Sequence, residues 1–216
     1  MAPQRDERDR LHEALIDLCF ERGFQNFGLG ALLSRAGVDR PSFERHFVDL
    51  EDCFLKIFEA EMDRYRCEFA PVAGECADWR ERVRVTLYAL FRFLVADERR
   101  ARFIVVESRV AGERARVFAD QRIETLFDLI DAGRSELDDP DSISRTTAEA
   151  VGGGILNQVY AAVARGVPLP PERELVPELM YCVVLPYAGL DAALEELYIP
   201  PPSSRVRPRP LGAHRG

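Results

Sequence analysis

Residues Gly23 to Phe54 read GFQNFGLGALLSRAGVDRPSFERHFVDLEDCF, and this stretch decides the fold of the N-terminal part of the chain. Two short amphipathic segments meet at Gly37, where a glycine can take positive φ and reverse the chain within a few residues. Asp39 is suited to cap the second segment, and Pro41 fits the first turn of a helix. The pattern predicts a helix-turn-helix.

The second helix of this motif has an apolar and a polar face. Phe43 and Phe47 are one turn apart and are expected to face inward together. This leaves the exposed side to four polar side chains, Arg40, Ser42, Glu44 and Arg45. A helix in the major groove of DNA reads base edges with side chains near its N-terminus, while neighbouring side chains contact phosphates.

These side chains have suitable chemistry for DNA. Arg40 can bind a guanine through two hydrogen bonds, and Ser42 can bond to several bases. Arg45 and His46 suit phosphate or base-edge contacts. The alternative is an exposed helix whose arginines are merely solvated.

Outward from this stretch, apolar residues recur at helical spacing, and no segment is a convincing strand. We expect a first helix from Arg10 to Arg22, ended by Gly23, with residues 1–9 frayed. A helix from about Leu50 to Phe69 and a connection around Pro71 and Gly74 follow the motif. Further helices are predicted around residues 83–95, 103–106 and 123–130, from Asp141 or Ser142 to about Arg165, and from Leu175 to Leu197 with a bend at Pro186. The predicted fold class is all-α.

The composition of the chain bounds its location and chemistry. With 216 residues, 47% of them apolar, it can bury a substantial core as one or two domains. We find no signal peptide and no apolar run long enough to cross a bilayer, so we expect a soluble cytoplasmic protein with no membrane partner. The five cysteines are expected to be buried free thiols, with a redox pair between Cys67 and Cys76 as the alternative: Cys19, Cys53, Cys67, Cys76 and Cys182.

The charge argues against indiscriminate binding of nucleic acid. The net charge is −8, and residues 1–50 hold seven arginines against nine aspartates and glutamates. Any contact with DNA must therefore come from the placement of arginines and not from bulk charge.

Motifs for catalysis are absent. His12, His46 and His214 are too far apart to suggest a metal site, and no zinc-protease helix, phosphate-binding loop or nucleophile elbow occurs. We expect no enzyme activity, no metal and no cofactor. His12 and Glu13 are expected to form a pair on the helix surface.

The quoted stretch also resembles the N-terminal domain of the TetR (tetracycline-repressor-like) family of transcriptional regulators. The matching residues are Glu21 to Phe24 at the end of the first helix, Ser34 to Val38 at the turn, Phe43, His46 and Phe47 on the recognition helix, and Phe54 on the fourth helix. The resemblance implies a helix-turn-helix head in residues 1–54, a helical ligand-binding and dimerisation domain in residues 55–199, and a disordered tail in residues 200–216. It also implies that DNA is contacted by Arg40, Pro41, Ser42, Arg45 and His46.

The chain departs from the family at positions that contact DNA. Glu44 stands where a phosphate-contacting tyrosine is usual, and Leu50 replaces a common lysine. Gly28 and Gly30 replace polar residues at the start of the second helix. Each lost phosphate contact weakens affinity and flattens its dependence on salt. The motif is retained as a fold, with fewer of the family's DNA contacts.

The resemblance further implies that a small effector binds inside the C-terminal domain. The residues expected near that cavity are aromatic or polar: Phe91, Phe103, Glu107, Phe118, Phe127, Asn157 and Tyr160, with Gln158 behind them. The alternative is that the aromatic residues are ordinary core and that Glu107 pairs with an arginine at the surface.

Three glycines, residues 152–154, lie within a helical pattern, where each costs roughly 1 kcal/mol relative to alanine. Close approach of another helix would offset this cost, and in the resembled family the last two helices form a four-helix bundle between two subunits. A symmetric homodimer is therefore expected, matched to a palindromic operator. The alternative is that the glycines interrupt the helix.

Together these observations favour a dimeric transcriptional regulator that binds a palindromic operator in double-stranded DNA and acts as a repressor until a small-molecule effector releases it. The alternative is a regulator-like dimer with weakened DNA binding that acts through ligand or protein contacts. Glu44, Leu50 and the acidic head favour this alternative.

Overall fold

Helices dominate the structure, a computed structural model that describes residues 6–73, 76 and 78–202. No strand occurs in these residues, which confirms the all-α prediction. The helices are α1 (Glu7–Arg22), α2 (Leu29–Ala36), α3 (Arg40–Glu44), α4 (Leu50–Ala73), α5 (Trp79–Ala96), α6 (Glu98–Val105), α7 (Glu113–Asp131), α8 (Arg145–Ala164) and α9 (Glu172–Glu196), with short 3-10 helices η1 (Phe24–Asn26), η2 (Glu107–Arg109), η3 (Ala132–Glu136) and η4 (Pro140–Ser142).

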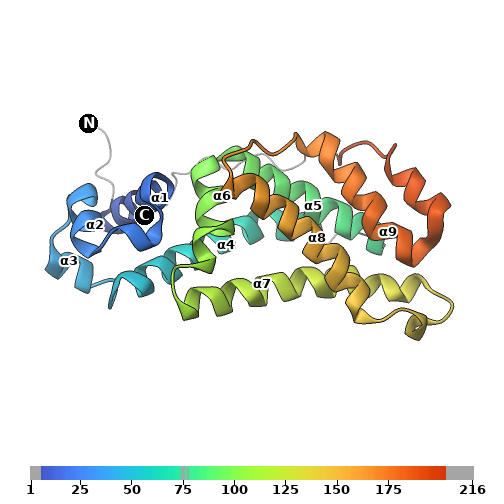
Figure 1. The fold of residues 1–216 in the computed structure, drawn as a ribbon, viewed down its shortest axis with the longest axis horizontal. Helices are drawn as coiled ribbons and strands as arrows, with labels where there is room; N and C mark the ends of the chain where they lie inside the picture. The colour runs from blue at the N-terminus through green and yellow to red at the C-terminus, as the bar shows by residue number, and fades with distance from the viewer. Residues whose placement is uncertain (1–5, 74–75, 77, 203–216) are drawn as a thin grey trace.

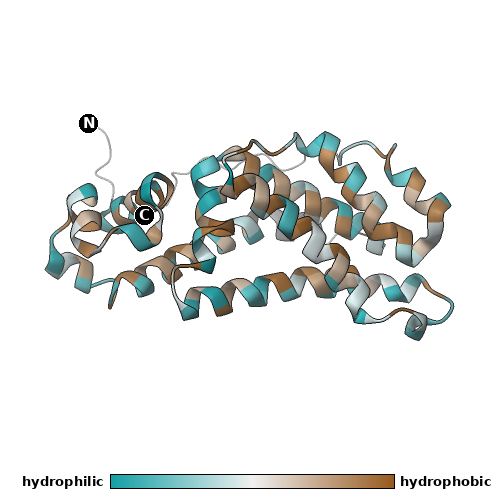
Figure 2. Ribbon diagram, in the orientation of Figure 1, coloured by the Kyte–Doolittle hydropathy of each residue, from teal (hydrophilic) through white to brown (hydrophobic). Residues whose placement is uncertain are grey.

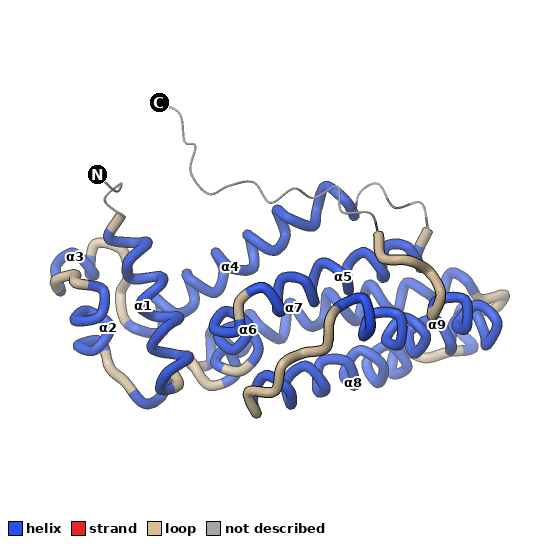
Figure 3. Tube along the Cα trace, turned by 90° about the horizontal axis from the view of Figure 1, so that it is seen from above, coloured by secondary structure: helices blue, strands red, loops and turns tan. Residues whose placement is uncertain are grey.

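The chain forms a small head and a larger helical body. Figure 1 shows α1, α2 and α3 together at one end of an elongated molecule, with α5 to α9 forming the other part. Helix α4 leads from the head into the body without a break, so it crosses the predicted domain boundary between residues 54 and 55. The view from above in Figure 3 shows the same division.

Several predicted helix ends need correction. Helix α1 begins at Glu7 instead of Arg10, because the acidic residues Glu7 and Asp9 favour the positive end of a helix. Helix α4 continues past Phe69 and Pro71 to Ala73, where a connection was predicted. Of the other predictions at the ends, residues 1–5, Gly74 and residues 203–216 of the tail lie outside the described residues.

The start of α8 also differs from the prediction. Asp141 and Ser142 lie in η4, and Asp139 caps that short helix by accepting a hydrogen bond from the Asp141 amide at 3.1 Å. Helix α8 follows Ser144, begins at Arg145, and is not interrupted by its glycines.

Helix α9 bends at Gly189, where φ is 79°, and not at Pro186 as predicted. Its length and composition would suit a membrane span, which corrects the prediction that no segment is apolar and long enough. It is the one such helix among the described residues, and its buried face packs on α5 and α8 as part of the core.

An aromatic cluster joins the head to the body. Phe54 of α4 packs edge-to-face against Phe24 of the head, with ring centroids 5.0 Å apart, and in a tilted arrangement against Phe103 of α6 at 4.4 Å. Phe58, one turn after Phe54, contacts Phe118 of α7 at 5.2 Å. In Figure 2 both apolar and polar residues occur along these helices, as expected for helices that bury one face.

Ion pairs reinforce this junction. The carboxylate of Glu61 in α4, only 2% exposed, is 2.7 Å from Nε2 of His12 in α1 and also pairs with Arg100 of α6. Arg100 pairs in turn with Glu13 of α1. His12 therefore pairs across helices with Glu61, which corrects the predicted surface pair between His12 and Glu13.

A second buried carboxylate lies at the far end of the body. Glu196, at the end of α9, accepts hydrogen bonds from Arg80 at 2.7 Å and from Arg84 at 2.7 Å and 2.9 Å. Both arginines belong to the first half of α5. The pairing fixes the end of α9 against α5.

The glycines of α8 have different surroundings. A Cβ on Gly152 would lie 2.7 Å from the Phe127 ring, so α7 approaches α8 closely there. A Cβ on Gly153 or Gly154 would meet no atom within 4 Å. The predicted close approach is therefore made at Gly152 by a helix of the same chain.

The cysteines divide into two groups. Cys19 and Cys53 are buried as predicted, and burial raises the pKa of the Cys53 thiol to about 12. Cys67 and Cys182 are exposed and Cys76 is partly exposed, which corrects the prediction that all five are buried.

Candidate functional site

The helix-turn-helix is built as the local sequence predicts. Helix α2 ends at Gly37, which takes the left-handed conformation with φ 62° and ψ 42°. The Asp39 side chain then caps α3 by accepting a hydrogen bond from the Ser42 amide at 2.9 Å. Phe43 and Phe47 are buried with their ring centroids 5.3 Å apart. These contacts fix α3 at the outer end of the head, as Figure 1 shows.

Arg40 and Glu44 share the exposed face of α3. Their side chains are 68% and 57% exposed, and Arg40 Nε lies 3.3 Å from Glu44 Oε1. The neighbouring Pro41 is also exposed. This face therefore offers a cation and a carboxylate together, a combination that can bind to base edges but repels phosphate at the carboxylate.

Ser42 and Arg45 face the first helix. Ser42 is only 6% exposed, so the prediction that it lies on the exposed side is wrong. Arg45 donates to Ser42 Oγ at 2.8 Å and to Glu7 Oε2 at 3.0 Å, while Ser42 Oγ donates to Glu7 Oε1 at 3.4 Å. The cause is Glu7, which lies far away in sequence and anchors α3 to α1.

The turn that follows α3 is held by the start of α4. The His46 carbonyl accepts a hydrogen bond from Lys56 Nζ at 3.0 Å, and the Val48 amide donates to Asp52 Oδ2 at 3.0 Å. The Val48 side chain is 84% exposed, and His46 is partly exposed. We define residues 40–48 as the recognition segment.

The residues expected around a ligand cavity belong to α5, α6, η2, α7 and α8. Phe91 and Phe103 are fully buried core residues, and Phe127 packs against Gly152. Asn157 is exposed, as is Gln158, and the Tyr160 ring lies under the Arg109 guanidinium at 4.6 Å.

Glu107 contacts the head and a neighbouring arginine. It is buried, accepts a hydrogen bond from the Phe24 amide of the head at 2.8 Å, and pairs with Arg102 at 3.2 Å. The alternative prediction was that Glu107 pairs with an arginine at the surface. The pairing with an arginine is confirmed, but Glu107 is buried and not at the surface.

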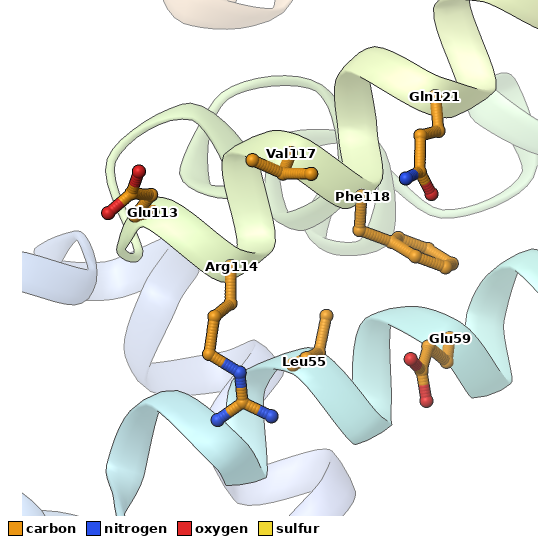
Figure 4. Close-up of a pocket in the computed structure, with 7 residues that line it drawn as sticks. All are labelled: Leu55, Glu59, Glu113, Arg114, Val117, Phe118 and Gln121. Atoms are coloured by element: carbon orange, nitrogen blue, oxygen red, sulfur yellow. The ribbon is translucent and has the colours of Figure 1, made fainter.

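A groove lies between α4 and α7. It has a volume of about 430 Å³ and is shown in Figure 4. Leu55, Val117 and Phe118 provide apolar walls, and Arg114 is the cation at one end. The complete set of lining residues is Leu55, Glu59, Glu113, Arg114, Val117, Phe118 and Gln121.

Sequence reasoning identified only Phe118 of these residues. The available signal was Val117, an apolar residue in a polar stretch that proves to be exposed in the structure. Residues 6–73, 76 and 78–202 contain no cluster of three or more His, Cys, Asp or Glu side chains placed to hold a metal ion.

Comparisons with known proteins point to one class. No model of a known protein family matches the chain. The chain is 26% identical over 133 residues to the HTH-type transcriptional activator FasR of Mycolicibacterium smegmatis, a match that covers 59% of this chain and 60% of that protein. It therefore spans less than two thirds of that relative's length.

Solved structures match over more of the chain. The fatty acid degradation regulator FadR from Bacillus halodurans superimposes with a TM-score of 0.69 at 16% identity, covering 83% of this chain and 95% of that one. The regulator FadR from Bacillus subtilis, solved in complex with stearoyl-CoA, gives 0.66 at 17% identity, with 84% and 98% covered. A TetR-like regulator from Rhodococcus sp. RHA1 gives 0.65 at 18% identity, with 88% and 100% covered. The chain has the fold of TetR-family transcriptional regulators, which confirms the resemblance seen in the sequence at the level of fold.

Proposed function

We propose that this chain, which has the fold of TetR-family regulators, is a cytoplasmic, dimeric repressor that binds a palindromic operator and is released by a small ligand. The observation that carries this proposal is the recognition segment, which places Arg40 on an exposed helix at the outer end of the head. The relatives named above are transcriptional regulators, which fits a protein that is not an enzyme.

The DNA contacts follow from the geometry of the head. Arg40 donates two hydrogen bonds to a guanine, Pro41 packs on the neighbouring base or sugar, and His46 contacts a phosphate. Ser42 is buried and has to exchange Glu7 for a phosphate or base in order to contact DNA directly. Arg45 is 60% exposed and uses only Nη2 for Glu7 and Ser42, so its other N–H groups can donate to a phosphate without that exchange.

Arg40→Ala is expected to weaken binding to the selected operator by about 1–3 kcal/mol, since it removes a two-bond contact to one base. The operator is first selected from a random pool of duplexes at moderate salt, and the affinity is then measured across a salt titration. Arg173→Ala is the matched control, because Arg173 is equally exposed but lies on α9, remote from the head. Recovery of one palindrome that Arg40→Ala does not weaken would exclude the proposed contact.

The α4–α7 groove is the proposed ligand site. Its apolar walls suit a long apolar body, and Phe118 is the one predicted ligand residue that lines it. The remaining predicted residues, Phe91, Phe103, Glu107, Phe127, Asn157 and Tyr160, would contact ligand only if the cavity deepens into the core. Stearoyl-CoA, the ligand of the B. subtilis structure, is the natural first probe.

Repression and release are tested together on the selected operator. In a reporter assay the protein should lower transcription, and stearoyl-CoA or a free long-chain fatty acid should weaken the DNA complex. FasR is named an activator, so a rise in transcription on binding would assign the opposite output. A tight DNA complex that none of these probes perturbs would count against the ligand switch.

A face of α8 and α9 is the proposed dimer surface. Exposed apolar side chains run from the bend of α9 to just past its end, namely Leu185, Leu190, Leu194, Leu197 and Tyr198. The open space above Gly153 and Gly154 gives room for a second backbone to approach α8. A symmetric pairing of these helices would bury the apolar patch.

Leu190→Glu is expected to shift the protein from dimer to monomer in sedimentation, because it places a charge in the apolar face. Val95→Glu is the control, since Val95 is similarly exposed on α5 outside this face. Both variants should keep the helical content of the parent. A dimer that persists in Leu190→Glu would remove this face as the interface.

A second candidate function is favoured by one observation. Both arginines of the recognition segment pair with carboxylates, Arg40 with Glu44 and Arg45 with Glu7. Each carboxylate offsets the positive charge beside it and so weakens the attraction to a DNA phosphate. A dimer that acts through ligand or protein contacts would show no enriched duplex and a flat salt dependence. Strong binding by the parent, not improved by Glu44→Tyr, would remove the basis for this alternative.

A further inference from the structure

The first turn of α4 holds the recognition segment through Asp52. This residue is buried, and its Oδ2 accepts the Val48 amide at 3.0 Å and the Lys56 ammonium at 2.9 Å. Burial raises the pKa of Asp52, but the Val48 amide, Lys56 and Arg114 outweigh burial and lower the pKa below its ordinary value. The carboxylate is therefore charged at neutral pH.

The same turn also holds the start of α7. Glu51 Oε1 accepts a hydrogen bond from the Arg114 amide at 3.3 Å. A Cβ on Gly112 would lie 2.2 Å from this oxygen, so the residue before α7 must be glycine for Glu51 to reach the helix end. Asp52 contributes as well, because its second oxygen, Oδ1, lies 3.6 Å from Arg114 Nη2.

Arg114 belongs to the ligand groove at the same time. Figure 4 shows its side chain extending from α7 toward α4, beside Leu55. Asp52 of α4 is the carboxylate that faces the guanidinium, while Glu51 of α4 binds the Arg114 backbone amide, and Glu113 and Glu59 line the groove. The two oxygens of Asp52 therefore contact the recognition segment on one side and a groove residue on the other.

We propose that Asp52 is the positioning residue that couples the α4–α7 groove to the recognition segment. Occupation of the groove displaces Arg114, which releases Asp52 Oδ1 and loosens the hold of Oδ2 on the Val48 amide. This inference rests on the proposed function for the meaning of the groove and the recognition segment. Its test needs neither DNA nor an identified ligand.

The first test measures hydrogen exchange at the Val48 amide by NMR on the full chain. Arg114→Gln is expected to speed exchange about tenfold, the equivalent of losing roughly one net hydrogen bond. Arg116→Gln is the matched control, because it makes the same change two residues on, at an exposed position that does not line the groove. Arg114→Lys should restore part of the protection. An unchanged exchange rate of the Val48 amide in Arg114→Gln would overturn the proposal. The same increase in Arg116→Gln, with the two variants equally stable, would also overturn it.

The second test mimics occupation of the groove. Val117→Trp adds apolar bulk to the groove wall and is expected to speed Val48 exchange, whereas Val167→Trp, at an exposed site in the α8–α9 connection, should not. In the Arg114→Gln background, Val117→Trp should add little, because both changes act through one contact. Additive effects would show that the groove reaches Val48 by another route and would overturn the role of Asp52. If the exchange results are as expected but the parent protein binds no DNA, the proposed function would be wrong while the coupling through Asp52 would stand.

Discussion

Replacing Glu61 with alanine is expected to lower the free energy of unfolding by about 3 kcal/mol, the lower end of the range for removing one partner from a buried ion pair. The carboxylate pairs with His12, Arg64 and Arg100 and lies at the junction of α1, α4 and α6. The lower end applies because Arg100 keeps Glu13 and Asp97 as partners. Urea unfolding measures the loss, and hydrogen exchange should show that α1 opens more readily than the body.

Asp63→Ala is the control for this prediction. Asp63 lies two residues away on the same helix, and its recorded partner is Arg66 in an exposed pair, so its loss should cost less than about 1 kcal/mol. Equal effects of the two substitutions would mean that burial of Glu61 adds nothing to its pairing.

The same carboxylate predicts how stability depends on pH. Burial raises the pKa of Glu61, but the hydrogen bond with His12 and the charges of Arg100 and Arg64 outweigh it, and the pKa is lowered. A lowered pKa contributes stability that is complete above the ordinary value of about 4.3 and is lost as the pH falls through the folded-state value. The difference in stability between the parent and Glu61→Ala should therefore stay constant above about pH 4.3 and shrink as the pH falls below that value.

The largest loss of stability is expected for Glu196→Ala, about 3–5 kcal/mol. Its side chain is fully buried, and the substitution removes the carboxylate to which Arg84 donates through Nε and Nη2. Arg80 keeps Glu195 and the Ala192 carbonyl. The loss should appear in urea unfolding and in faster hydrogen exchange along α5 and α9.

Glu195→Ala is the matched control, since Glu195 is adjacent and also pairs with Arg80 but is exposed. Its effect should stay below about 1 kcal/mol. In Glu196→Ala, hydrogen exchange in α1 should rise only as much as the loss of global stability requires. In Glu61→Ala, by contrast, α1 should exchange faster than the body. Selective opening of the head in Glu196→Ala would contradict the separate roles of the two carboxylates.

Local signals in the sequence were sufficient to predict that the chain is helical and to predict the turn of the head, but not several of the helix ends. Gly37 and Asp39 act on backbone groups within a few residues of themselves, so their roles could be predicted without the rest of the fold. The bend of α9 was placed wrongly, because Pro186 only suggests a bend, whereas Gly189 takes a positive φ that ends regular helix geometry.

Contacts between distant residues could not be predicted in this way. Ser42 is buried because Glu7 comes to it from another helix, and Glu107 faces the head because the η1 amide of Phe24 needs an acceptor there. Helical periodicity tells which side of a helix is buried but not which buried side chains surround a cavity. The groove depends on how α4 and α7 pass each other, and the contacts between them include Glu51 and Asp52 with Arg114 and Phe58 with Phe118.

The paired arginines of the recognition segment have a consequence for how such a protein would search a chromosome. Arg40 and Arg45 each bring a carboxylate with them, so random duplex offers little net attraction to the head. Few molecules would then be sequestered on unrelated sequence, and encounters with the operator would gain little from long-range steering. Under the proposed function, selectivity would come from a low background on competing sites, and a modest number of molecules per cell would then occupy their target.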